Sequence, residues 1–164
     1  IERVAMEAGV STQGLEIIDP YASEQYVQFV EKYLELRHRK GVTLRGARNH
    51  MSDRVRFGMM LVKEGYADGL VCGLSTNYPE TIRPALQIIG LREQDSVVAG
   101  MYLILQKNRM YFFADTTVNI EPDAETLAEI AILTAQEVKK FDVVPRVAMI
   151  SFSGTLDKKK EKNK

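Results

Sequence analysis

Residues 67–89 read ADGLVCGLSTNYPETIRPALQII and carry the strongest signal for the fold. The run 69–73 is apolar on both faces and bounded by glycines, which is typical of a strand buried in a parallel sheet. A polar loop over 74–77 follows, and a helix is expected near 79–89, because Pro79 suits a first helical turn. The stretch therefore predicts a strand, a loop and a helix in sequence.

Apolar periodicity predicts further elements on both sides of this stretch. Helices are expected over residues 1–9, 22–39, 44–49, 53–65 and 121–141, strands over 15–18 and 146–151, and a hairpin of 97–106 and 110–114 around Lys107-Asn108-Arg109. This order of strands and helices indicates a mixed α/β domain.

Length and composition exclude several classes of protein. The chain has 164 residues, of which 45% are apolar and 27% charged, so a disordered, collagen-like or disulfide-stapled protein is excluded. Its 22 basic and 22 acidic side chains give a net charge of +0, which argues against a nucleic-acid or anionic-membrane partner. No apolar run approaches the ~20 residues of a membrane helix. The single Cys72 permits no internal disulfide, fits a reducing, cytoplasmic location and is expected to be an inert core thiol.

The two ends of the chain have distinctive compositions. The chain begins at Ile1 without an initiator Met or a signal-peptide pattern, so we expect a piece of a longer protein. Residues 157–164 hold five Lys and cannot bury apolar area. The expected organisation is a partial domain over 1–153 and a disordered lysine-rich tail over 154–164.

The predicted strand and helix of 67–89 create one candidate site. Ligands of open α/β sheets gather at the carboxyl ends of strands. Ser75 and Thr76 follow the strand and could present hydroxyl and backbone N–H groups to an anion, and Arg83, one turn into the helix, could clamp a phosphate. A plain turn beside a surface arginine is the alternative, because no complete phosphate-binding motif is present.

A second candidate site follows the hairpin, at residues 114–119. Its polar side chains, among them Thr116 and Asn119, could hydrogen-bond a ligand or could form turns that lead into the next helix.

Arg37 begins a basic cluster over 37–40 at a helix end. It either complements the helix dipole or forms one arm of a phosphate or CoA site. His38 and His50 do not have the spacing of a metal pair on one helix, so no metal site is expected.

Five segments together resemble the phosphate acetyltransferase/phosphate butyryltransferase family. They are 35–43 (ELRHRKGVT), 67–73 (ADGLVCG), 81–89 (TIRPALQII), 113–119 (FADTTVN) and 145–151 (PRVAMIS). Each motif is weak alone, but five in family order across residues 1–153 are specific.

The resemblance implies an incomplete three-layer α/β fold of the isocitrate/isopropylmalate dehydrogenase type, with a mixed or parallel sheet, and a homo-oligomer. It implies exchange of CoA for phosphate on an acetyl group by direct attack of the CoA thiolate, helped by an aspartate base. Arg37 and Arg83 then occupy positions that hold phosphate or CoA, where two guanidiniums could stabilise developing charge. With Ser75, Thr76, Thr116 and Asn119 they form the expected substrate-binding set.

Two departures from the family pattern bear on function. Stand-alone transferases often carry a cysteine after the Ala-Asp pair, whereas this chain has Thr116-Thr117, which looks more like the transferase-like domain fused to NADP-dependent malic enzymes. In those proteins the domain regulates or oligomerises the enzyme and senses acetyl-CoA. The family's catalytic Ser-Arg and Asp positions lie beyond 145–151, so catalytic residues stay unassigned, and the opening βα unit is also expected to be absent.

Three hypotheses follow. The first is a partial phosphotransacetylase-like domain of a malic enzyme that binds acetyl-CoA or acyl phosphate for regulation and assembly. The second is a fragment of a catalytic phosphate acetyltransferase, and the third is a structural domain without a ligand. The expected partners are small molecules: acyl-CoA, acyl phosphate or phosphate. We expect the chain alone to be inactive and to hold no cofactor, with NADP and a divalent metal only in a fused malic-enzyme domain.

Overall fold

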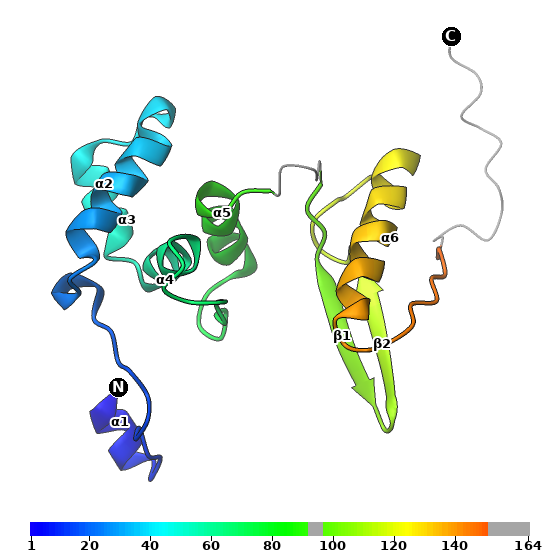
Figure 1. Ribbon diagram of the computed structural model, residues 1–164, viewed down its shortest axis with the longest axis horizontal. Coiled ribbons are helices and arrows are strands. Elements are labelled where there is room, and N and C mark those ends of the chain that lie inside the picture. The colour runs from blue at the N-terminus through cyan, green and yellow to red at the C-terminus, as the bar shows by residue number, and fades with distance from the viewer. Residues whose placement is uncertain (92–96, 151–164) are drawn as a thin grey trace. The chain divides into compact units, whose positions relative to one another are not determined.

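The computed structural model describes residues 1–91 and 97–150 (Figure 1). It has two compact units, one over Ile1–Gly90 and one that begins at Leu91, and each is described by itself. Helices and a small antiparallel sheet are both present, so the predicted mixed α/β class is confirmed. The predicted lysine-rich tail over 154–164 lies outside the described residues.

The first unit is helical. Its elements are α1 (Glu2–Glu7), η1 (Pro20–Ala22), α2 (Tyr26–Arg37), η2 (His38–Lys40), α3 (Leu44–Met51), α4 (Arg54–Lys63) and α5 (Tyr78–Ile88). Each predicted helix before residue 90 is confirmed, with small shifts at its ends. Thr43 and Asp53 accept backbone N–H groups at the starts of α3 and α4, and Gly41 ends η2 with a φ of 84°.

The core of this unit lies where α2 packs on α3 and where α4 adjoins both α3 and α5. Phe29 and Tyr33 of α2, Met51 of α3, Met60 of α4 and Ile88 of α5 are all buried. The rings of Phe29 and Phe57 lie 5.2 Å apart. The Tyr26 hydroxyl donates to the Arg48 carbonyl at 3.0 Å, which adds a polar tie between α2 and α3.

The described part of the second unit, 97–150, contains an antiparallel hairpin and one long helix. β1 (Met101–Gln106) pairs with β2 (Arg109–Ala114), and α6 (Ala124–Lys139) packs against β2 (Figure 1). The predicted hairpin and the predicted helix are confirmed. The Phe112 ring contacts Phe141, just beyond α6, at 5.4 Å. The opposite hairpin face carries exposed Tyr102, Ile104, Tyr111 and Phe113.

Three predicted strands are wrong. Residues 15–18, 69–73 and 146–150 form no sheet, because β1 and β2 are the only paired strands among residues 1–91 and 97–150. A buried parallel strand needs hydrogen-bonded neighbours, and these runs have none in the described part of the chain. Val71 and Leu74 are fully exposed, at 101% and 105%. The predicted parallel sheet and isocitrate dehydrogenase-like architecture are therefore not confirmed.

Cys72 corrects a related expectation. It lies in the same extended run and is exposed, so the predicted core thiol is wrong. No strand pairs with this run among residues 1–91 and 97–150, so Cys72 is not enclosed in a sheet.

Replacement of Phe29 tests whether the interface of α2 with its neighbours holds the first unit together. Phe29→Ala should lower the free energy of unfolding by about 3–5 kcal/mol, because the ring is fully buried. The measurement is urea unfolding followed by far-ultraviolet circular dichroism. Val27→Ala is the control, since Val27 lies on the same helix but is 66% exposed, and should change stability by less than about 0.5 kcal/mol. Equal losses in both variants would contradict the assigned core.

Candidate functional site

Arg37 ends α2, and its side chain is half-buried. Its Nε atom is buried and has no hydrogen-bond partner among the described residues. Two further nitrogen atoms are buried and have no hydrogen-bond partner among the described residues. They are His50 Nδ1, near the end of α3, and Arg56 Nε, in the first turn of α4. The positive charges of Arg56 and Arg37 both lower the pKa of His50. Arg37, His50 and Arg56 are named here the α2–α4 cluster.

The surroundings of His50 in this cluster are mixed. Its ring meets the buried Tyr33 ring edge-on, with centroids 5.4 Å apart and planes at 90°. Asp53 supplies negative charge nearby, but its Oδ1 already accepts the Arg56 backbone N–H at 2.9 Å and the Arg56 guanidinium at 3.4 Å. Burial lowers the pKa of His50 from 6.5, the positive charges of Arg56 and Arg37 lower it further, and Asp53 partly opposes them. A lowered pKa favours the neutral imidazole at neutral pH.

Sequence reasoning identified Arg37 but missed Arg56 and missed this environment of His50. The sequence offers His50 only as a possible metal ligand, and nothing in the pattern around Arg56 distinguishes it from a surface arginine of a helix. Asp53 three residues before it is the one local clue, since aspartate at that spacing caps a helix and can pair with the basic side chain.

The predicted site residues Ser75 and Thr76 lie in the loop before α5, and Arg83 lies within α5; they differ in exposure and in hydrogen-bond partners. Ser75 is exposed, and the Thr76 hydroxyl lies 3.2 Å from that of Thr81. The Glu80 carboxylate accepts the Asn77 N–H at 3.3 Å, so an acidic side chain already lies at this helix N-terminus. An anion held here would compete with that carboxylate.

Arg83 is exposed and has no hydrogen bond or ion pair with the described residues. Its guanidinium is therefore available to a ligand. No described contact joins Arg83 to Arg37, so their convergence on one anion stays a prediction.

The loop after β2 is built by hydrogen bonds between its own residues. Asp115 has a left-handed φ of 54°, and its Oδ1 accepts the Asn119 backbone N–H at 3.1 Å. The Asn119 side-chain amide donates to Asp115 Oδ1 at 2.9 Å and to the Val98 carbonyl at 3.0 Å. The turn alternative therefore describes this loop, and within the Asn119 side chain only the carbonyl oxygen is left for a ligand. Thr116 is exposed, and both residues belong to the second unit.

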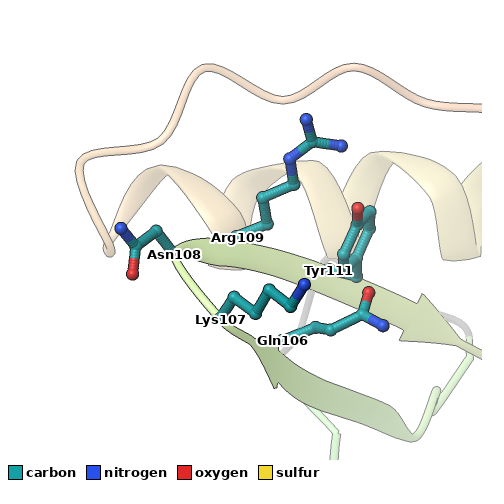
Figure 2. A pocket seen from close by; sticks show the side chains of 5 residues that line it. All are labelled: Gln106, Lys107, Asn108, Arg109 and Tyr111. Carbon is teal, nitrogen blue, oxygen red and sulfur yellow. The ribbon is translucent and has the colours of Figure 1, made fainter.

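A hollow lies at the turn between β1 and β2 (Figure 2). It is lined by Gln106, Lys107, Asn108, Arg109 and Tyr111. None of these is a predicted site residue.

The described residues contain neither a membrane-spanning helix nor a cluster of metal ligands. Over residues 1–91 and 97–150, no helix is both long and apolar enough to cross a bilayer. No group of three or more His, Cys, Asp or Glu side chains in these ranges is arranged to hold a metal ion.

Comparison with known proteins settles the family. The family model described as Phosphate acetyl/butaryl transferase matches residues 1–164. The chain belongs to this family. It is 42% identical over 153 residues to the phosphate acetyltransferase of Bacillus subtilis strain 168, which covers 93% of this chain and 47% of the relative. It is 38% identical over 154 residues to the phosphate acetyltransferase of Escherichia coli K12, covering 93% of this chain and 21% of that protein.

Solved structures agree with the family assignment. The fold is similar to that of EutD phosphotransacetylase from Staphylococcus aureus, with a TM-score of 0.82 and 36% identity over 93% of this chain and 46% of the other. A phosphotransacetylase from Streptococcus pyogenes gives a TM-score of 0.81 at 39% identity, over 92% of this chain and 46% of the other. The chain thus spans about half the length of these structures. Nothing in the comparisons indicates fusion to a malic enzyme.

Replacement of Asn119 tests the loop after β2. Asn119→Ala removes both side-chain donations and should destabilise the second unit by about 1–2 kcal/mol. Thr116→Ala is the control, because Thr116 is an exposed residue of the same loop. Amide hydrogen exchange within β1 and β2 provides the readout. Equal protection in the two variants would contradict the structural role of Asn119.

The lowered pKa of His50 predicts a pH dependence of stability. Because the folded pKa lies below the unfolded value of 6.5, the unfolded chain takes up the proton first on acidification. This contribution to stability is present above 6.5 and is lost as the pH falls toward the folded pKa. Melting temperatures measured from about pH 8 to about pH 5.5 should therefore fall less in His50→Gln than in the wild type. His38→Gln, which alters an exposed ring, should follow the wild type, and identical slopes in all three proteins would refute the assignment.

Proposed function

We propose that this chain is the ligand-binding part of a phosphate acetyltransferase, which converts acetyl-CoA and phosphate to CoA and acetyl phosphate. The observation that carries the proposal is the 42% identity over 153 residues to the Bacillus subtilis phosphate acetyltransferase. The likeness to two phosphotransacetylase structures supports it independently.

Arg37 and Arg83 are the residues proposed to bind phosphate groups. In the reaction that the family resemblance implies, the CoA thiolate attacks the acetyl carbonyl carbon of acetyl phosphate. The bond from that carbon to the bridging oxygen breaks, and phosphate leaves with the electron pair. Guanidiniums near the phosphoryl oxygens would stabilise this charge through paired N–H donors. The exposed guanidinium of Arg83 supports its role, and the role of Arg37 rests on the family resemblance.

Hydroxyl and amide groups complete the proposed substrate-binding set. Ser75 and Thr116 are exposed and could donate hydrogen bonds to a ligand. Thr76 could reach a ligand only by sharing its contact with Thr81. Asn119 acts mainly through the loop that it holds.

The properties of the whole enzyme belong to the same proposal. Turnover, a homo-oligomeric assembly and a cytoplasmic location are inferred from the family resemblance and the composition. We propose no cofactor beyond CoA as substrate or effector, and no residue of this chain is assigned as the catalytic base.

The malic-enzyme reading depends on one local feature, Thr116-Thr117. The relatives described above are phosphate acetyltransferases, so the transferase reading is preferred. The malic-enzyme hypothesis would predict binding of acetyl-CoA or acyl phosphate without transfer of the acetyl group.

Replacement of Arg83 tests the transferase reading by calorimetric titration of the chain with CoA and with acetyl phosphate. Arg83→Ala should weaken binding of both by about ten- to a hundredfold, the usual loss for a charged hydrogen-bonded pair. Arg45→Ala is the matched control, because Arg45 is exposed on α3 and carries the same charge, and it should bind as the wild type does. Failure of the wild-type chain to bind either ligand would favour a structural domain without a ligand.

A further inference from the structure

The hollow at the turn between β1 and β2 lies on one face of the hairpin (Figure 2). Gln106 and Arg109 are cross-strand partners, and Tyr111 follows two residues along β2, so strand alternation places these three side chains on the same face. Phe112 points to the other face, where it contacts Phe141 just beyond α6. The hollow has a volume of about 490 Å³, which is the size of a small-molecule site. It can therefore hold an organic molecule rather than only a single ion.

The lining of this hollow is basic. Lys107 in the turn and Arg109 at the start of β2 each carry a positive charge, and none of the five described residues that line the hollow is acidic. Neither of these side chains forms an ion pair or a hydrogen bond with residues 1–91 or 97–150. The side-chain amides of Gln106 and Asn108 add further N–H donors. The hollow thus offers two unneutralised positive charges and several donors to a ligand.

The backbone at Lys107 is a second, independent feature of this hollow. Lys107 and Asn108 form a two-residue loop between the paired Gln106 and Arg109, and Lys107 has a left-handed φ of 53°. The first position of such a loop favours glycine or asparagine, because a longer side chain is strained there. The lysine side chain extends back from the turn along the strands and lines the hollow (Figure 2). Strain that places a charged group in a hollow is typical of a functional position.

We propose that this hollow is a binding site for a small organic dicarboxylate, with Arg109 holding one carboxylate and Lys107 the other. The proposal goes beyond the proposed function, because it uses neither Arg37 nor Arg83 and concerns a ligand that takes no part in acetyl transfer. The planar guanidinium of Arg109 matches the two oxygens of a carboxylate, and the ammonium of Lys107 acts as a point charge on the second group.

The other lining residues favour an organic ligand over an inorganic anion. Tyr111 offers an aromatic ring to the carbon chain between the two carboxylates and a hydroxyl that can hydrogen-bond. The two cations belong to different segments, the turn and β2, so they suit two separate anionic groups. A single compact anion such as phosphate would leave the ring of Tyr111 without a contact.

Succinate is the probe for this site, and the backbone amide signals of the chain in two-dimensional NMR provide the readout. Succinate should shift the amides of Lys107, Asn108 and Arg109 in a saturable manner and leave those of α2 and α3 nearly unchanged. Succinamate and succinamide have the same carbon chain with one carboxylate and none. At equal ionic strength each should bind at least about tenfold more weakly than succinate. No saturable response, or equal binding of succinate and succinamate, would overturn the proposal.

Matched arginine variants separate a built site from diffuse charge. Arg109→Gln should weaken succinate binding by about tenfold or more, whereas Arg146→Gln should change it by less than about twofold. Arg146 is the control because it is exposed in the same unit and its loss changes the net charge equally. Equal effects of the two substitutions would contradict the site.

Replacement of Lys107 by glycine separates binding from folding. Lys107→Gly removes one cation and also relieves the strained φ, so it should raise the melting temperature and weaken succinate binding by about tenfold. A variant that is more stable than the wild type cannot owe weaker binding to unfolding. Succinate binding equal to that of the wild type in Lys107→Gly would refute the role of this lysine and with it the proposed site.

Other ligands keep this proposal separate from the proposed function. If inorganic phosphate shifts the hairpin amides at the same concentrations as succinate, the site accepts any dianion and the dicarboxylate assignment is wrong. If CoA or acetyl phosphate displaces succinate, the hollow belongs to the substrate site and the proposal of a separate ligand is wrong. Arg83→Ala should leave succinate binding intact. If succinate binds while CoA and acetyl phosphate do not, the proposed function fails alone, and in the reverse case the dicarboxylate site fails alone.

Discussion

Burial of the aromatic side of α2 against its neighbouring helices is the constraint on which the rest of the first unit depends. Phe29 and Tyr33 contribute rings with almost no exposed surface, and Met51 and Met60 pack in the same core. Removing this apolar area from water is the main favourable term available to so small a helical unit. The same packing fixes the end of α2 against α3 and the start of α4, so the side chains that gather there are a consequence of the core.

The second unit is also stabilised by burial of apolar side chains, but it buries fewer of them. An isolated two-stranded ribbon is marginally stable in water, and here α6 covers only one of its faces. The other face leaves Tyr102, Ile104, Tyr111 and Phe113 partly in solvent, and the runs around Val71 and Ile150 are likewise exposed. The chain spans about half of the phosphotransacetylase structures that it resembles, at 46%. Exposed apolar runs of this kind are consistent with a chain that spans about half of the related structures.

Prediction from sequence succeeded where the signal was local and failed where it depended on distant partners. Helical periodicity, Gly41 and Pro79 correctly located the helices, because a helix satisfies its hydrogen bonds within one segment. The run around Val71 has strand composition, but pairing is decided by chain segments that periodicity cannot see. In the candidate site, the family motifs identified Arg37 and Arg83. The charges that surround His50, including that of Arg56, are known only from the folded structure. From the sequence, the polar residues of the loop, Asp115 and Asn119 among them, could bind a ligand or form a turn. The hydrogen bonds between these two residues show that they form a turn.

The central claim is that Arg37 and Arg83 bind the same ligand, although 46 positions separate them along the chain. A crystal structure of this chain with bound CoA is the most direct measurement. The account predicts that phosphate oxygens of the CoA lie within hydrogen-bond distance of both guanidiniums. A well-ordered CoA molecule that contacts neither arginine, or guanidiniums directed away from it on opposite sides of the unit, would contradict the account.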